Sequence, residues 1–257
     1  MSNRAERRAE SRGARNRGAV ELKAPAAPPQ QPQIISLAYV IDPDRGMPME
    51  FHRSISRTLQ ALVGRYGIRE LPTERTYDEA ADLTRLVDAF LGTNDDFLLL
   101  ADPDVVFGPE DVALLLAAGQ PIAGALSFAA ATGQEPRCTA LVEVGDGAYA
   151  PPDLPALPEI PEIAEDANDE DKGTAVAQYI KALEEVVPVK VSTPGRGLML
   201  ITHEAVAAVR STYKQPLERE SEERAPDLVF CERAADAGFD SYLVPRAAVG
   251  RVVRMVV

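Results

Sequence analysis

The stretch NDDFLLLADPDVVFGPEDVALLLAAGQPIAGALSF, residues 94–128, decides the fold of this chain. Phe97–Ala101 is a nearly continuous apolar run, which is typical of a strand buried on both faces of a sheet. Pro103 cannot continue a central strand, so Asp102 and Asp104 are expected in the loop at the strand's carboxyl end. Open α/β sheets bind their ligands at that edge. Two acids there indicate a metal site, although Asp-Pro-Asp is also a common turn sequence.

The segments around this stretch predict further helices and strands. Pro109 at the first helical position, followed by two acids, predicts a helix that ends at Gly119, and residues 122–128 can form the next strand. Ile34–Ile41 is predicted to be the first strand of the domain. Apolar residues at helical spacing predict a helix over 51–66, and a capping box at Thr76 and Glu79 predicts another that ends at Gly92.

Composition favours one catalytic domain. The chain has 257 residues, of which 46% are hydrophobic, enough for one large α/β core or two small ones, and one domain is the simpler interpretation. Its net charge of -13 argues against general binding to nucleic acids or anionic membranes, since their phosphates would be repelled. Cys138 and Cys231 match no zinc spacing and favour a reducing compartment. With no apolar leader or spanning segment in the sequence, we expect a cytoplasmic protein.

Two segments are expected to be loosely attached to this domain. Residues 1–33 combine a basic stretch with an Ala/Pro/Gln stretch, so they are predicted to be a disordered tail, either a solvated leader or a docking arm for an acidic partner. The domain itself is predicted to span residues 34–257. Within it, residues 150–172 are rich in acids and prolines and are predicted to be a flexible insertion.

Three sequence blocks resemble, in the same order, motifs of GT-A-type nucleotide-sugar glycosyltransferases, in particular family-2-like members from bacteriophages and bacteria. Residues 102–128 resemble their Asp-x-Asp region. Residues 195–201 are similar to the Gly-x-Gly strand that borders the acceptor pocket, where glycine lets the backbone approach a sugar. Residues 227–245 are similar to their Glu-Asp-x-x-Phe-Cys helix and the strand after it. The resemblance implies an α/β fold, namely a single-domain, Rossmann-type α/β/α sandwich with a mostly parallel central sheet.

The resemblance also implies a reaction and its residues. Asp102 and Asp104 would hold Mn²⁺ or Mg²⁺, which bridges the two phosphates of a UDP- or GDP-sugar. Asp227, if the enzyme inverts, would take the proton from an acceptor hydroxyl on a protein or a glycan. The reaction would take place in the cytoplasm, which is the host's if a phage encodes the chain.

Four further positions are candidates for contact with the donor. Tyr39 lies near the end of the first strand and Asp42 directly after it, where the family binds the nucleotide, although an ordinary turn explains Asp42 equally well. Arg85 matches the arginine of the family's Ala-Arg-Asn element and could reach the diphosphate, or could be a solvated helix residue. Arg251 stands where the family often has a metal-binding histidine. Because arginine cannot bind a metal, either Asp104, the diphosphate and water hold the cation, or Arg251 itself neutralises the leaving group.

Two other functions remain open from the sequence. Asp102 and Asp104 also fit the nucleophile motif of haloacid-dehalogenase-like phosphatases, with Asp236 and Asp240 as a later metal pair. That nucleophile usually lies on the first strand, whereas here other elements precede it. A non-catalytic interaction module on a degenerate transferase fold is the third possibility, favoured by Arg251, by Pro226 in place of the usual first acid of the helix, and by the acidic insertion.

Overall fold

A computed structural model describes residues 32–129, 137–145, 147–156, 185–213 and 224–251, and single residues between 158 and 182. The described residues belong to one compact unit. The tail predicted over residues 1–33 lies almost entirely outside the described residues, as does most of the insertion predicted over 150–172. Both therefore stay predictions.

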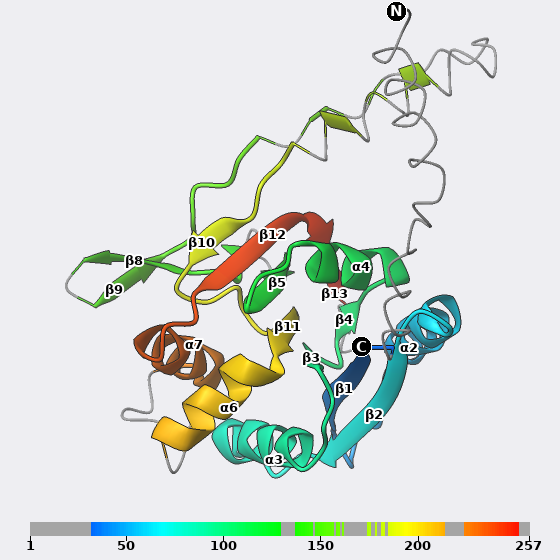
Figure 1. Ribbon diagram of the computed structural model, residues 1–257, viewed down its shortest axis with the longest axis vertical. Coiled ribbons are helices and arrows are strands. Elements are labelled where there is room, and N and C mark those ends of the chain that lie inside the picture. Colours follow the sequence, from blue (N-terminus) through cyan, green and yellow to red (C-terminus); the bar gives the residue numbers. More distant parts are fainter. Residues whose placement is uncertain are drawn as a thin grey trace, which may run out of the picture. The chain divides into compact units, whose positions relative to one another are not determined.

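A central sheet organises the described part of the chain (Figure 1). Five of its strands point in one direction, and β10 and β11 run against them. From one edge to the other the sheet consists of β10 (Val189–Val191), β12 (Ser241–Ala248), β5 (Ile122–Leu126), β11 (Leu198–Thr202), β3 (Phe97–Ala101), β1 (Ile34–Ile41) and β2 (Gly67–Glu74).

Among the described strands, three two-stranded sheets lie outside the central one. They pair β4 (Val105–Val106) with β13 (Gly250–Arg251), β6 (Phe128–Ala129) with β7 (Arg137–Cys138), and β8 (Val142–Gly145) with β9 (Ala148–Ala150). The first of these brings the end of the described chain back to the loop after β3.

Helices cover both faces of the central sheet, each over its own hydrophobic core. On one face pack α2 (Met49–Leu62) and α4 (Pro109–Ala117). On the other pack α3 (Glu79–Leu91), α6 (His203–Thr212) and α7 (Pro226–Asp236). This is the α/β/α sandwich with a mostly parallel sheet that the sequence predicted, and that prediction is confirmed.

The apolar run of β3 is explained by this two-sided burial. Leu99 and Ala101 join the core under α2 and α4, whereas Leu98 and Leu100 join the core under α3, α6 and α7. Alternate residues of a strand point to opposite faces, so a strand with a helical layer on each side needs apolar residues throughout.

The predicted helices and strands are present, but some bounds differ, and β2 and one helix cap were not predicted correctly. The helix predicted over 51–66 spans Met49–Leu62, and the strand predicted over 122–128 ends at Leu126. β1 and β3 have the predicted bounds, and α4 begins at Pro109. β2 was not predicted from the sequence GIRELPTE, because an edge strand exposes one side and needs no apolar run. Pro72 is tolerated there, since an edge strand leaves one row of its backbone donors unpaired. The cap of α3 is Asp78, which accepts the amides of Ala80 and Ala81, so the Thr76 capping box was wrong.

The antiparallel direction of β11 matters most for the candidate site. The carboxyl ends of β1, β3 and β5 lie on one side of the sheet, and the antiparallel strand β11 begins on that same side. The turn Pro194-Gly195-Arg196-Gly197 therefore lies beside the loop that holds Asp102 and Asp104. The Asp102 amide donates a hydrogen bond of 3.1 Å to the Gly197 carbonyl and fixes the turn against the loop.

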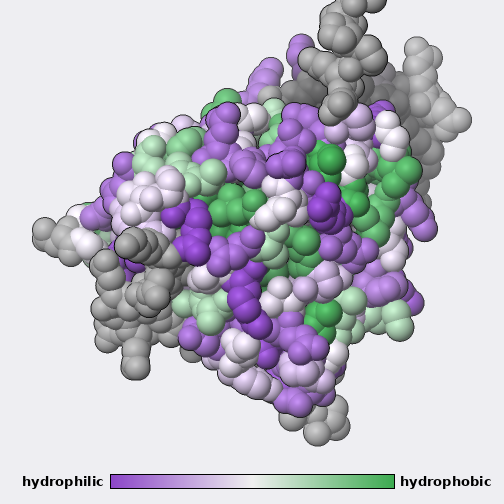
Figure 2. All heavy atoms as spheres, turned by 60° about the horizontal axis from the view of Figure 1, so that its bottom comes forward, coloured by the Kyte–Doolittle hydropathy of each residue, from purple (hydrophilic) through white to green (hydrophobic). Residues whose placement is uncertain are grey.

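The described surface is mixed in polarity. On the face that Figure 2 shows, hydrophobic residues gather in separate patches among hydrophilic ones. Among the described helices, none has the length and apolarity that a membrane span requires.

The contact of β5 with the turn before β11 gives a test of the fold. A Cβ added at Gly124 would lie 2.2 Å from the Pro194 Cβ, a distance that real atoms do not adopt. We expect Gly124→Ala to lower the free energy of unfolding by about 1–3 kcal/mol, the usual cost of overpacking a tight core. Urea denaturation followed by circular dichroism measures it.

Gly250→Ala is the matched control, because a Cβ there would meet only the Val106 Cβ, at 4.0 Å. Equal stability of the Gly124→Ala variant and the wild type would show that the β5 contact with Pro194 is not as close as described.

Candidate active site

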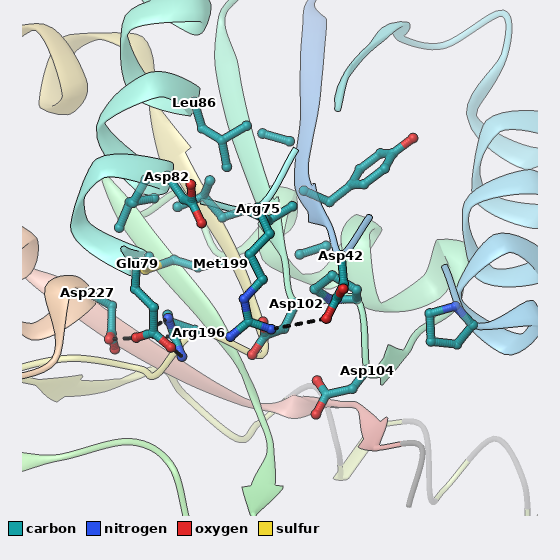
Figure 3. A pocket seen from close by; sticks show the side chains of 18 of the residues that line it. Asp42, Arg75, Glu79, Asp82, Leu86, Asp102, Asp104, Arg196, Met199 and Asp227 are labelled. Carbon is teal, nitrogen blue, oxygen red and sulfur yellow. Dashed lines mark hydrogen bonds and ion pairs between the residues drawn. The ribbon is translucent and has the colours of Figure 1, made fainter. Parts of the chain in front are cut away.

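A cavity of about 470 Å³ opens at the edge of the sheet where β1 and β3 end and β11 begins (Figure 3). The amino-terminal ends of α3 and α7 also reach it, through Glu79 and Asp227. Residues far apart in the sequence thus meet in one place. The predicted residues Tyr39, Asp42, Asp102, Asp104, Asp227 and Arg251 all line this cavity.

The acid pair lies in a short loop between β3 and β4. The Val105 amide donates to the Asp102 carbonyl at 3.0 Å, which closes the turn around Pro103. The side chain of Asp102 is 26% exposed and that of Asp104 is 45% exposed. Burial raises the pKa of Asp102, the charge of Arg196 lowers it, and the neighbouring Asp104 raises it again. The pair is therefore held close together at a cost in electrostatic repulsion.

Arg251 lies against both acids of the pair. The pairing of β13 with β4 sets Arg251 opposite Val105, next to the acid loop. Its Nη1 lies 3.0 Å from Oδ2 and 3.3 Å from Oδ1 of Asp104, and its Nη2 lies 3.5 Å from Oδ2 of Asp102. The side chain is only 21% exposed. A fixed positive charge thus occupies the position between the two carboxylates.

Asp227 is a buried carboxylate at the start of α7. Pro226 takes the first helical position, so Asp227 lies in the first turn, where helix amides favour negative charge. Its Oδ2 accepts a hydrogen bond of 3.2 Å from the Thr193 hydroxyl, and its Oδ1 lies 4.0 Å from Nε of Arg196. Burial raises the pKa of Asp227, and Arg196 opposes that shift. A carboxylate with a raised pKa accepts a proton more readily near neutral pH.

Tyr39 and Asp42 line the cavity where β1 ends. The Tyr39 hydroxyl donates to Oε2 of Glu70 at 2.8 Å, and burial raises the pKa of this phenol, so it stays protonated. Oδ1 of Asp42 accepts the amides of Asp44 and Arg45, the turn geometry that the sequence left open as the alternative. Its Oδ2 lies 3.8 Å from Nη1 of Arg75, a contact drawn in Figure 3.

Arg85 is not among the residues that line the cavity. Its Nη2 donates to the Glu74 carbonyl at 2.5 Å and to Oδ1 of Asp82 at 2.6 Å, so it joins α3 to the end of β2. The described cavity instead contains Arg75 and Arg196, which the sequence did not single out. Arg75 was missed together with β2. The only sequence feature that pointed to Arg196 was its position between Gly195 and Gly197.

The acids required by the phosphatase alternative are separated. β12 begins at Ser241, which pairs with Ile122 at the start of β5, so Asp240 lies at the edge of the sheet opposite the acid pair. There Asp240 pairs with Lys190 at 2.7 Å, and Asp236 accepts the Tyr213 hydroxyl at 3.2 Å. These two acids therefore cannot share a metal with Asp102.

The donor set of the cavity suits a hard divalent cation. The described residues bring no three His, Cys, Asp or Glu side chains into one metal-binding group. Mg²⁺, however, is commonly held by one or two carboxylates together with substrate phosphates and water. Within the described lining there are six carboxylates, of Asp42, Glu79, Asp82, Asp102, Asp104 and Asp227, and four guanidinium groups, of Arg45, Arg75, Arg196 and Arg251. This surplus of negative charge would repel a diphosphate unless a cation entered with it.

Comparisons with known proteins found similarity in solved structures alone. No family model matches the sequence, and no curated protein matches it. The chain is similar to A197 from STIV, with a TM-score of 0.48 and 12% identity over 86% of each chain. It is also similar to GalNAc-T7 with UDP, GalNAc and Mn²⁺, with a TM-score of 0.47 and 10% identity over 87% of this chain and 43% of that one.

A third similar structure is the inositol-1-phosphate CTP transferase from T. maritima, with a TM-score of 0.41 and 9% identity over 87% of this chain and 90% of that one. All three TM-scores lie below 0.5, so these likenesses carry no conclusion about this chain.

Proposed function

We propose that this chain transfers a sugar from a nucleoside-diphosphate sugar to an acceptor hydroxyl, with the donor bound in the cavity. The observation that carries the proposal is the convergence in this cavity of Asp102 and Asp104, the buried acid Asp227, and Arg196 and Arg251. The paired acids and the arginines can hold a diphosphate leaving group through a cation and through guanidinium groups. The separate buried acid can act as a general base.

Two groups of lining residues would bind the two parts of the donor. Tyr39, Asp42 and Arg75 would take the nucleoside, since Asp42 can accept hydrogen bonds from ribose hydroxyls. Asp102, Asp104 and Arg251 lie where the diphosphate would be held. Mn²⁺ or Mg²⁺ bound by Asp102 and Asp104 would compensate charge on the departing diphosphate. Arg251 contributes a guanidinium group, which can bind phosphate oxygens with two parallel hydrogen bonds.

Asp227 accepts the proton in the proposed transfer. The bond between the anomeric carbon and the phosphate oxygen breaks, and the electron pair leaves with the nucleoside diphosphate. A bond forms between that carbon and the acceptor oxygen, whose proton passes to the Asp227 carboxylate. The acceptor is proposed to be a hydroxyl on a protein or a glycan.

A three-way assay tests the function against its rivals. The protein is incubated with UDP- and GDP-sugars and Mn²⁺, and with p-nitrophenyl phosphate and Mg²⁺. We expect slow release of UDP or GDP and no release of p-nitrophenol. Release of p-nitrophenol alone would favour the phosphatase, and no turnover of either substrate would favour a non-catalytic module.

Asp104→Asn tests the acid pair. The change keeps the shape of the side chain but removes its charge, so we expect loss of Mn²⁺-dependent binding of UDP or GDP. The melting temperature should change little, because Asp104 is 45% exposed. Isothermal titration calorimetry with Mn²⁺ and each nucleotide measures the binding. Asp153→Asn, an exposed acid outside the cavity lining, is the matched control, and equal binding by both variants would contradict the assignment.

Arg251→Ala tests the competition between the guanidinium group and a metal for the same carboxylates. Without nucleotide, we expect this variant to bind Mn²⁺ roughly 10- to 100-fold more tightly, because it loses charge-assisted hydrogen bonds worth about 1.5–3 kcal/mol. The electron paramagnetic resonance signal of free Mn²⁺ measures this directly. Arg251→Lys keeps the charge and should retain wild-type affinity, whereas unchanged affinity in Arg251→Ala would show that Arg251 does not occupy the metal position.

The raised pKa of Asp227 predicts the pH dependence of the proposed reaction. The base must be ionised, so kcat/KM should fall as the pH drops through its pKa, and burial places that fall above the pH expected for an ordinary aspartate. Asp227→Asn should lower kcat by about 100-fold or more and abolish this acid limb. A wild-type acid limb that persists in the Asp227→Asn variant would assign it to another group.

A further inference from the structure

The turn before β11 presents a single long side chain to the cavity. A Cβ added at Gly195 would lie 2.4 Å from Oγ1 of Thr139, and one added at Gly197 would lie 2.6 Å from Oγ of Ser127. Gly195 also has a φ of +82°, which residues with a Cβ rarely adopt. The glycines thus let the turn pack against the segment after β5, and Arg196 between them points into the cavity (Figure 3).

Arg196 lies between acids from three different elements. Its Nη1 lies 2.9 Å from Oε2 of Glu79 at the start of α3, and its Nε lies 4.0 Å from Oδ1 of Asp227 at the start of α7. The backbone of its neighbour Gly197 accepts the Asp102 amide, so the acid loop is fixed relative to it as well. Glu79 therefore holds the guanidinium group through both of its carboxylate oxygens, and the group lies at the limit of ion-pair distance from Asp227.

The same segment also binds the second oxygen of Asp227. The Thr193 hydroxyl accepts the Gly195 amide at 3.2 Å and the Cys231 thiol at 3.7 Å, so its own proton is left for Oδ2 of Asp227, at 3.2 Å. One oxygen of Asp227 thus faces Thr193 and the other faces Arg196. Thr193 and Arg196, from one segment before β11, thus contribute to both the orientation and the electrostatic environment of this carboxylate.

We propose that Arg196 is a positioning residue, which keeps Asp227 ionised and aimed at the acceptor hydroxyl. The inference rests on the proposed function for the identity of the reaction, but the electrostatic part of it can be measured without any reaction. The groups that face Asp227 are Arg196 and Glu79, Asp102 across the cavity, and the Cys231 thiol on its own helix. Burial raises the pKa of Cys231 to about 12, so this thiol stays neutral, and Arg196 is the cation among these groups.

The test compares two arginines of the same cavity. Arg196→Gln removes the charge beside Asp227, whereas Arg75→Gln removes a charge that lies beside Asp42. The carboxyl ¹³C signal of Asp227, assigned by its absence from Asp227→Asn, is titrated by NMR in each variant. We expect the titration midpoint of Asp227 to move upward in Arg196→Gln and to stay at the wild-type position in Arg75→Gln and in Arg196→Lys.

The kinetic arm uses the same variants. Arg196→Gln should lower kcat by about 10- to 100-fold with an unchanged KM for the donor, shift the acid limb of kcat/KM upward, and be partly rescued in Arg196→Lys. A raised donor KM with an unchanged Asp227 midpoint would overturn the proposal and make Arg196 a donor-binding residue. If no sugar donor is turned over at all, the proposed function fails, and the NMR midpoints still decide whether Arg196 controls Asp227.

Discussion

The hydrogen bond from the Asp102 amide to the Gly197 carbonyl is the contact on which the candidate site depends. It joins the end of β3 to the start of an antiparallel strand that comes about a hundred residues later. In a sheet whose strands all ran one way, the residues before β11 would lie at the far edge. Because β11 is antiparallel, Arg196 before it lies on the same side of the sheet as Asp102 and Asp104 after β3. Charges of both signs therefore line one cavity.

The two arginines divide four of the acids of the cavity into two groups. Asp102 and Asp104 share Arg251, whereas Asp227 and Glu79 share Arg196. Burying each of these carboxylates would cost free energy if no cation lay beside it, and each guanidinium group contacts more than one acid. The described lining nevertheless keeps a surplus of carboxylates. Under the proposed function, this surplus would repel a free diphosphate and favour one that enters with a divalent cation.

The parts of this candidate site that depend on local patterns can be predicted from the sequence. The apolar run of β3, the proline that ends it and the acid at the start of α7 are all visible in short windows of sequence. Arg196 and Arg75 were missed, because their place in the cavity follows from the direction of β11 and from the edge strand β2, and neither leaves a hydrophobic pattern. For Arg85, a resemblance to a family motif predicted contact with the donor. The structure instead places its guanidinium group against Asp82 and the Glu74 carbonyl, outside the cavity lining.

The position of β11 in the sheet also has a consequence for how the chain folds. β3 and β5 are close in sequence but do not pair, because β11 lies between them. The half-sheet of β2, β1 and β3 and the half-sheet of β5, β12 and β10 are joined only through this strand among those described. During synthesis the first half must therefore leave the edge of β3 open until residue 202 has emerged, and the two halves close in a late, long-range step. A chain with this topology should fold slowly, and the edge of β3 stays open to pairing with other strands until β11 is added.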